Sequence, residues 1–174
     1  MSSKIRVAIL AGPDYEDLEL HYPLLRLIEA GYEVKVIALS KDIVKGKHGL
    51  LVKPDLTFAE ADPKEFDCVV IPGGWAPDRL RRYKEVLDFV KAIYDKGGIV
   101  AAICHGPQVL ISAKLLKGKR VTCVSAIKDD VINAGAEYLD APVVRDGNLI
   151  TSRVPRDLPH FCQEIISALK SLKK

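Results

Sequence analysis

The chain has 174 residues, a formal net charge of +3 and a hydrophobic fraction of 48%. This length and composition suit one α/β domain, residues 1–174, with a sizeable buried core. The charge is too small, and too evenly mixed in sign, to favour a nucleic acid partner. No apolar segment reaches the length of a transmembrane helix, and no signal peptide precedes the first strand. We therefore expect a cytoplasmic protein without membrane contact.

The first forty residues predict a βαβ unit. Strands are expected at residues 4–11 and 32–39. The helix between them carries four apolar side chains on one side, Leu18, Tyr22, Leu25 and Ile28. Such a unit implies a parallel sheet with a right-handed crossover. The polar segment 40–57 is expected to hold a small hairpin.

The rest of the chain continues the alternation of strands and helices. Further strands are expected at residues 67–72, 99–103, 120–124, 143–145 and 149–152. Further helices are expected at residues 77–96, 107–116, 129–134 and 158–172. This order predicts an α/β fold with a mostly parallel central sheet.

Residues 99–113 predict a buried strand, a sharp turn and a helix, and the turn holds Cys104. In open α/β sheets, ligands bind at this carboxyl edge of the strands. The N–H groups at a helix N-terminus favour a thiolate over a thiol. We therefore interpret Cys104 as a nucleophile, and the alternative is a buried core cysteine.

Two other strand ends bring polar groups to the same edge. The first strand is followed by four carboxylates, Asp14, Glu16, Asp17 and Glu19. One of them could hydrogen-bond to the sulfur, or they could merely cap the helix. The third strand is followed by the pair Gly73–Gly74. Its N–H groups, with that of His105, could hold an oxyanion, unless the pair is only a tight turn.

Several kinds of site are not expected. The sequence contains no G-x-G-x-x-G and no G-x-x-x-x-G-K-[ST] motif, so we expect no nucleotide cofactor. The histidines outside the turn, His21, His48 and His160, lack metal-ligand spacing, and we expect no metal. The remaining cysteines are expected to be core residues, Cys68, Cys123 and Cys162. The chain has only two Asn, two Gln and one Met, which weakly indicates a thermophilic source.

Nine segments together resemble one known family over residues 4–172. They are Tyr15–Glu19, Lys45–Gly49, Asp55–Phe58, Ile71–Gly74, Ala76–Asp78, Ala102–Gln108, Ile127–Asp130, Ile132–Gly135 and Ser152–Pro155. These segments are similar to the ThiJ/PfpI family, within the glutamine amidotransferase class I-like superfamily, and most closely to its PfpI-type intracellular proteases. The resemblance implies a flavodoxin-like three-layer sandwich, with the cysteine on a strained nucleophile elbow.

The resemblance also implies roles for individual residues. Cys104 is the expected nucleophile, His105 its neighbour that handles the proton, and Glu16 the acid that hydrogen-bonds to the thiolate. Gly74 and His105 supply the oxyanion N–H groups. Asp78 stands where the family has a glutamate that reaches the histidine of an adjacent subunit. Self-association to a dimer, and on to a hexamer, is therefore implied.

Two positions depart from the family pattern. Asp78 is one methylene shorter than the family's glutamate, and Val124 replaces a tyrosine that close relatives carry near the site. A glutamine amidotransferase is not expected, because the only late histidine, His160, is not part of a His-x-Glu motif.

Three functions follow as hypotheses. The first is a cofactor-free cysteine hydrolase that cleaves peptides, a PfpI-type protease. The second is a glyoxalase III or protein deglycase, whose substrate is a small reactive carbonyl compound such as methylglyoxal, or its adducts. The third is a non-enzymatic redox sensor or chaperone in which the same cysteine is oxidised.

Overall fold

A seven-stranded sheet forms the centre of the computed structural model, which describes residues 4–172. The strands in spatial order are β10 (Val143–Asp146), β11 (Leu149–Ser152), β7 (Ile99–Ile103), β6 (Cys68–Ile71), β1 (Arg6–Leu10), β2 (Glu33–Ala38) and β5 (Leu56–Thr57). All neighbours are parallel except β10 and β11. The predicted α/β fold with a mostly parallel sheet is confirmed.

The two central strands, β6 and β7, are buried along their whole length. Their sequences, CVVI and IVAAI, are continuous apolar runs, as expected for strands that are covered on both faces. Because β6 and β7 are parallel neighbours, with Ile71 paired to Ala102, their carboxyl ends deliver Gly73 and Cys104 to the same edge.

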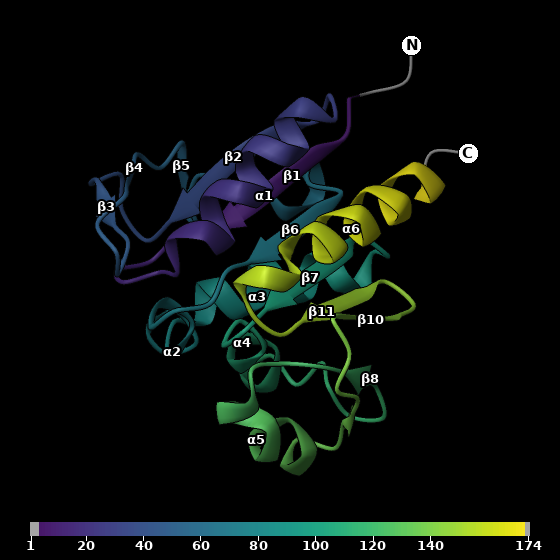
Figure 1. Cartoon of the computed structure of the whole chain (residues 1–174). Helices are drawn as coiled ribbons and strands as arrows, with labels where there is room; N and C mark the ends of the chain where they lie inside the picture. The colour runs from purple at the N-terminus through teal and green to yellow at the C-terminus, as the bar shows by residue number, and fades with distance from the viewer. Residues whose placement is uncertain (1–3, 173–174) are drawn as a thin grey trace.

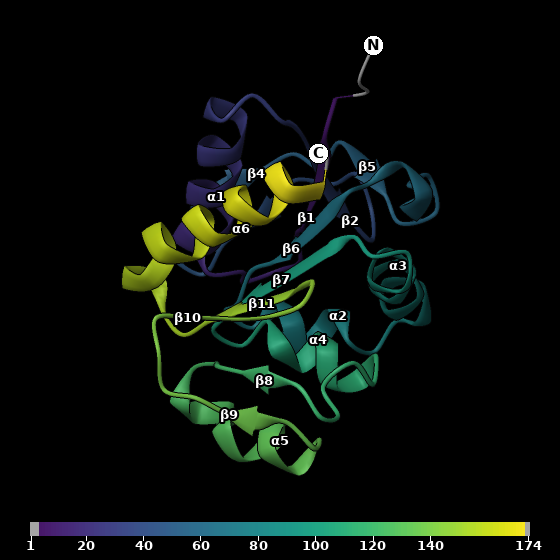
Figure 2. The same ribbon diagram turned by 90° about the vertical axis from the view of Figure 1, so that its right-hand side faces the viewer.

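Helices cover both faces of the sheet and make three layers (Figures 1 and 2). One outer layer consists of α1 (Asp17–Glu29) and α6 (Leu158–Leu172). The other consists of α2 (Ala76–Leu80), α3 (Lys84–Asp95) and α4 (Pro107–Ser112). The expected flavodoxin-like sandwich is therefore present. No helix within residues 4–172 is both long and apolar enough to cross a membrane.

Smaller elements lie outside the main sheet. The expected hairpin in 40–57 is confirmed as β3 (Val44–Lys45) and β4 (Leu51–Val52). A second small unit, made of α5 (Lys128–Asn133), β8 (Arg120–Val121) and β9 (Glu137–Tyr138), packs beyond α4 (Figure 2). Three short 3₁₀ helices complete the described elements, η1 (Pro63–Glu65), η2 (Ser125–Ile127) and η3 (Pro155–Asp157).

Three predicted elements differ from those observed. The helix expected at 77–96 is two helices, α2 and α3, because the chain is extended at Tyr83, with φ −104° and ψ 121°. The helix expected at 107–116 ends at Ser112, and Lys114 then adopts a left-handed conformation with φ 59°. The strand expected at 120–124 is only β8, which pairs with β9 and not with the main sheet.

Helix α1 turns its apolar stripe outward. The four side chains of this stripe are 36–67% exposed, namely Leu18, Tyr22, Leu25 and Ile28. The buried face instead carries Glu19, Leu20, Pro23 and Leu27. A carboxyl group thus lies on the core side of α1, and this orientation decides which acid reaches the site.

Candidate active site

Cys104 occupies a sharp turn between β7 and α4. Its φ is 64°, in the left-handed region, which costs a residue with a side chain about 1–3 kcal/mol. The turn is held by two backbone hydrogen bonds: Cys104 N–H donates to Ser152 O at 3.0 Å, and Val124 N–H donates to Cys104 O at 3.2 Å. Val124, one of the two departures from the family pattern, therefore lies directly beside the cysteine.

The glycine pair after β6 forms the wall opposite this turn. Glu16 N–H donates to Gly73 O at 3.1 Å, and Trp75 N–H donates to the carbonyl of Asp14 at 2.9 Å. Gly74 has φ 79°, and a Cβ there would collide with the backbone of Glu16. A Cβ on Gly73 would lie 2.8 Å from the Cβ of Cys104. Only glycines allow these two segments to approach the cysteine so closely.

Backbone N–H groups and an imidazole surround the sulfur. The N–H groups of His105 and Gly74 both interact with the Cys104 sulfur. The Nδ1 atom of His105 lies 3.5 Å from Sγ. The ring of Trp75 lies against His105, with 6.0 Å between the ring centroids. The structure thus brings together Cys104, His105 and Gly74, and their catalytic roles stay a proposal.

The carboxyl group that interacts with Cys104 belongs to Glu19, and not to Glu16 as the resemblance implied. The Glu19 side chain is fully buried, and its Oε2 accepts a hydrogen bond from Gly73 N–H at 2.7 Å. Its Oε1 has no partner among the described residues. Burial raises the pKa of Glu19 to about 8. A protonated carboxyl group at this position has a hydroxyl to donate toward the sulfur.

Cys104 and Glu19 act as coupled acids. Burial, followed by the negative charge of Glu19, raises the pKa of the Cys104 thiol, and the N–H groups of His105 and Gly74 oppose this. The net direction is opposite to the one expected from the helix N-terminus alone. The repulsion from Glu19 is lost once its carboxyl group takes the proton, but burial, the largest cause, still raises the pKa of the thiol.

Glu16 lies one helical turn before Glu19 and faces the turn between β3 and β4. Its Oε2 accepts from Lys47 Nζ at 2.7 Å and lies 3.5 Å from His48 Nε2. Glu16 is the residue before α1 begins, and its buried carboxylate is paired with Lys47. The sequence pattern did not single out Glu19, because the apolar stripe of this helix predicts a different buried face from the one observed.

Asp78 lies on α2 and its carboxylate is engaged within the same helix. Arg82 Nη2 donates to Asp78 Oδ2 at 2.6 Å, and both side chains are exposed. No contact between Asp78 and His105 is found within residues 4–172 of one copy. The expected role of Asp78 at the histidine of an adjacent subunit stays a prediction.

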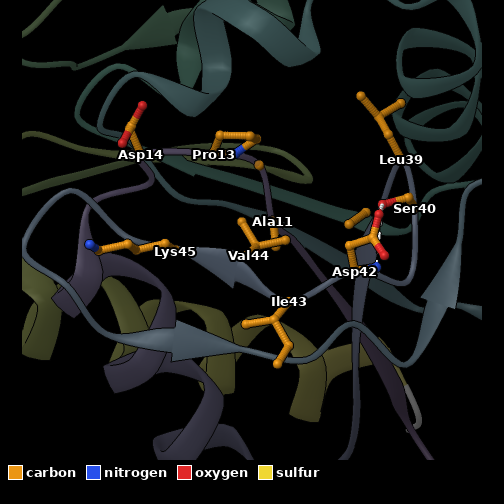
Figure 3. Close-up of a pocket in the computed structure, with 11 residues that line it drawn as sticks. Ala11, Pro13, Asp14, Leu39, Ser40, Asp42, Ile43, Val44 and Lys45 are labelled. Carbon is orange, nitrogen blue, oxygen red and sulfur yellow. Dashed lines mark hydrogen bonds between the residues drawn. The ribbon is translucent and has the colours of Figure 1, made fainter.

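A pocket of about 400 Å³ lies next to the site, at the carboxyl ends of β1 and β2 (Figure 3). Its lining is mostly apolar, with Asp14 and Lys45 at one end and Ser40 and Asp42 at the other. Cys104 is not part of this lining. Asp14 connects the two regions, because its carbonyl accepts the N–H of Trp75 beside the glycine pair.

Comparisons with known proteins agree with this fold and site. A sequence model described as the DJ-1/PfpI family matches residues 5–168. Deglycase PYRAB04690 of Pyrococcus abyssi is 48% identical, over 95% of this chain and 100% of its own. YraA of Bacillus subtilis, which carries a provisional cysteine protease name, is 46% identical over 98% of this chain and 100% of its own.

Solved structures show the same architecture. The crystal structure of DJ-1beta from Drosophila melanogaster matches with a TM-score of 0.90 and 31% identity, over 95% of this chain and 90% of that chain. A two-domain protein from Anabaena variabilis, with a DJ-1/ThiJ/PfpI-like and a ferritin-like domain, matches with a TM-score of 0.94 and 49% identity. The match covers 96% of this chain but only 48% of the two-domain protein.

Proposed function

The chain belongs to the DJ-1/PfpI family, and from this premise we propose that it is a cysteine hydrolase of the deglycase type. Its proposed substrates are adducts that a reactive α-oxoaldehyde such as methylglyoxal forms with amino groups. One observation carries this proposal: a fully buried carboxyl group, Glu19, interacts with Cys104 and keeps its proton up to about pH 8. The deglycase name of a 48% identical relative supports the same substrate class.

In the proposed reaction, Cys104 is the nucleophile and Glu19 transfers a proton. The thiolate forms a C–S bond to the adduct carbon that bears the hydroxyl group, and the C–N bond breaks as the amine leaves with a proton. Glu19 then moves a proton from this carbon to the neighbouring carbonyl carbon, while the hydroxyl proton passes to the carbonyl oxygen. This internal rearrangement turns the hemithioacetal into a thioester of a 2-hydroxy acid without an external oxidant. Water cleaves the thioester and releases a 2-hydroxy acid and the free thiol.

The backbone would stabilise the charge that develops in these steps. The N–H groups of Gly74 and His105 interact with the sulfur, and in the proposed reaction they would donate to an oxygen on the attacked carbon. Each such donor is typically worth about 3 kcal/mol of transition-state stabilisation. Cys104, Glu19, Gly74 and His105 all belong to one copy of the chain. The proposed deglycase reaction would therefore not require self-association.

Peptide hydrolysis is the second candidate, and the contact of Cys104 with His105 favours it. Burial lowers the pKa of His105, and the charge of Lys47 lowers it further, so the imidazole is neutral and could accept the thiol proton. This chemistry would also use Asp78 from a neighbouring copy to orient the imidazole. The provisional protease name of YraA supports this candidate.

Self-association is proposed on the exposed stripe of α1. The hairpin next to α1 exposes further apolar side chains, Ile43, Leu50 and Leu51. Exposed apolar patches of this kind are typical of protein interfaces. We propose a second copy of the chain as the occupant. The cytoplasmic location stays a prediction.

The proposed function is tested by replacing the nucleophile. Wild type, Cys104→Ala and the control Cys162→Ala are incubated with a peptide treated with methylglyoxal, and release of lactate and free amine is measured. The same proteins are incubated with unfolded casein. We expect Cys104→Ala to lose lactate release while the control keeps it. Equal release from wild type and Cys104→Ala would refute the deglycase proposal.

The casein assay tests the peptidase candidate. Cleavage of casein by wild type that is lost in Cys104→Ala would support it. If no reaction depends on Cys104, the redox or chaperone hypothesis remains.

A further inference from the structure

Trp75 presents a large apolar side chain to solvent directly beside His105. The indole is 62% exposed, and its ring centroid lies 6.0 Å from that of the imidazole, within the contact range of two aromatic rings. The imidazole in turn contacts the sulfur, since its Nδ1 lies 3.5 Å from Cys104 Sγ. A single imidazole ring therefore separates the exposed indole from the Cys104 sulfur.

The backbone of Trp75 is fixed on both sides. Its N–H donates to the carbonyl of Asp14 at 2.9 Å, and the next two residues along α2, Ala76 and Pro77, are buried. The indole itself is outside the core. A rigid backbone thus holds a large exposed aromatic ring at the edge of the site.

Asp14 connects this edge to the neighbouring pocket of about 400 Å³. It has a left-handed φ of 59°, a conformation that strains a residue with a side chain. Its carbonyl accepts the N–H of Trp75, and its own N–H donates to Lys45 O at 2.9 Å. Its carboxylate lies 2.8 Å from Arg79 Nη2. Asp14 and Lys45 together form one end of the pocket (Figure 3), so the strained turn joins the pocket to the indole.

The pocket is suited to an uncharged apolar group. Aliphatic side chains line it, among them Ala11, Leu39, Ile43 and Val44 (Figure 3). Its volume and its mostly apolar lining with a few polar groups are typical of sites that bind small organic groups. Asp42, at the end away from Asp14, already accepts the hydroxyl of Ser40 at 3.1 Å. Because both carboxylates of the pocket have partners, a cationic occupant is not favoured.

An adduct consists of a small part that reacts at the sulfur and a larger part that carries the amino group. The inner wall of the site leaves little space for the larger part. A Cβ on Gly73 would lie 2.8 Å from the Cβ of Cys104 and 2.5 Å from Oε2 of Glu19. The part that carries the amino group therefore extends toward the exposed edge, where the indole of Trp75 offers an apolar surface.

We propose that the peptide that bears the adduct crosses the indole of Trp75 and places an uncharged apolar side chain in the pocket beyond Asp14. The inference rests on the proposed function, and it narrows the substrates to adducts on peptides with an apolar residue near the modified one. In this arrangement Trp75 and Val44 determine specificity and take no part in the proton transfers. Their loss raises KM for such peptides and leaves kcat unchanged.

The test measures lactate release from peptides that contain one lysine modified by methylglyoxal. In the peptide series, a single leucine replaces serine at each position on either side of this lysine. The methylglyoxal adduct of glycinamide is the substrate without a peptide. The variants are Trp75→Ala, Trp75→Phe and Val44→Thr, the last of which keeps the size of the side chain but adds a hydroxyl. The control is Tyr83→Ala, which removes a 44% exposed aromatic ring that does not line the pocket.

Wild type is expected to show a kcat/KM about tenfold higher with leucine than with serine at one position of the series. Trp75→Ala and Val44→Thr should each reduce this preference about three- to tenfold through KM, and Trp75→Phe should keep most of it. All variants should turn over the glycinamide adduct like wild type, and Tyr83→Ala should keep the full preference. Absence of any preference in wild type, or an equal loss on peptide and glycinamide adducts in folded Trp75→Ala, would overturn the proposal.

Binding can also be measured without a reaction, because Trp75 is the only tryptophan of the chain. The unmodified leucine peptide is titrated into Cys104→Ala while the indole emission is recorded. We expect a change in emission that the serine peptide produces only at about tenfold higher concentration. This selective response without lactate release from wild type would refute only the proposed function. Lactate release without a selective response would refute only the peptide site.

Discussion

The buried carboxyl group of Glu19 interacts with Cys104, and its Oε2 also accepts the N–H of Gly73 at 2.7 Å. Two acids thus meet in a region of low polarity, with too few donors to stabilise two negative charges. Burial raises the pKa of Glu19 to about 8 and that of the Cys104 thiol to about 12, so the two groups do not both ionise at neutral pH. This relationship gives rise to the first two predictions.

Replacing Glu19 by Gln is expected to lower the turnover of a methylglyoxal adduct by about 100-fold or more, because a positioned acid–base group is lost. The amide keeps the hydrogen bond from Gly73 but cannot move a proton. The measurement is steady-state lactate release. Glu85→Gln, an exposed carboxylate on α3, is the control and should match wild type. Wild-type turnover by Glu19→Gln would exclude a proton-transfer role for this residue.

The raised pKa of Glu19 also predicts a change of stability with pH. The folded state binds this proton more tightly than the unfolded state, since the pKa rises from 4.5 to about 8 on folding. The free energy of unfolding therefore falls as pH rises from about 4.5 to about 8, by at most about 4 kcal/mol. We expect Glu19→Gln to lose much of this slope in urea titrations at pH 5 and pH 8. An unchanged slope would mean that Glu19 ionises at its ordinary pKa.

Gly74→Ala is expected to cost at least about 3 kcal/mol of stability and to impair the reaction. Its left-handed φ of 79° and its contact with the backbone of Glu16 both exclude a side chain. Gly147→Ala is a matched control, because its φ is 61° but no atom lies within 4 Å of the added Cβ. This control should cost about 1–2 kcal/mol. Equal losses in chemical denaturation would show that backbone conformation, and not close packing, is what matters at Gly74.

Leu25→Glu is expected to shift the protein toward monomers in sedimentation experiments. Leu25 is 67% exposed at the centre of the apolar stripe on α1, so a charge there would be buried without a partner in a dimer. Ile132→Glu places the same charge at a 43% exposed position on α5, away from the stripe. If both variants sediment like wild type, the α1 stripe is not the contact between copies.

The peptidase candidate predicts that Asp78 matters only in the assembled protein. Asp78→Asn should lower casein cleavage by the larger species, and Asp78→Glu should raise it, because the longer side chain reaches further. In one copy of the chain the Asp78 carboxylate accepts a hydrogen bond from Arg82. If Arg82→Gln reproduces the effect of Asp78→Asn, then the carboxylate acts through that ion pair and not on a neighbouring histidine.

Much of the fold could be predicted from the sequence, because the buried strands are short apolar runs closed by glycine or proline. The break between α2 and α3 could not, since no such residue stands at Arg81–Tyr83 and the segment 77–96 is continuous in its pattern. The orientation of α1 also could not be predicted. Its apolar stripe faces outward, and Glu19 occupies a buried position that a carboxylate normally avoids.

The residues of the site also differ in how well the sequence predicts their positions. The turn that holds Cys104, His105 and Gly106 could be predicted because its contacts are local to one strand–turn–helix segment. The choice between Glu16 and Glu19 depends on which face of α1 meets the sheet, and the position of Lys47 depends on a turn held by Asp17. Both are set by tertiary contacts between segments far apart in the chain. The resemblance implied Glu16, whereas the structure places the carboxyl group of Glu19 at Cys104.

Because the other three cysteines are buried, their reactivity can report on local unfolding of this chain. Cys68 lies in the central sheet, Cys162 in the outer helical layer, and Cys123 just beyond β8, and each is fully buried as a free thiol. After Cys104 has been blocked, a second reagent can reach these sulfurs only when their surroundings open. The order in which they are trapped would rank the local stability of the sheet, of helix α6 and of the small unit around β8 in the unmutated protein.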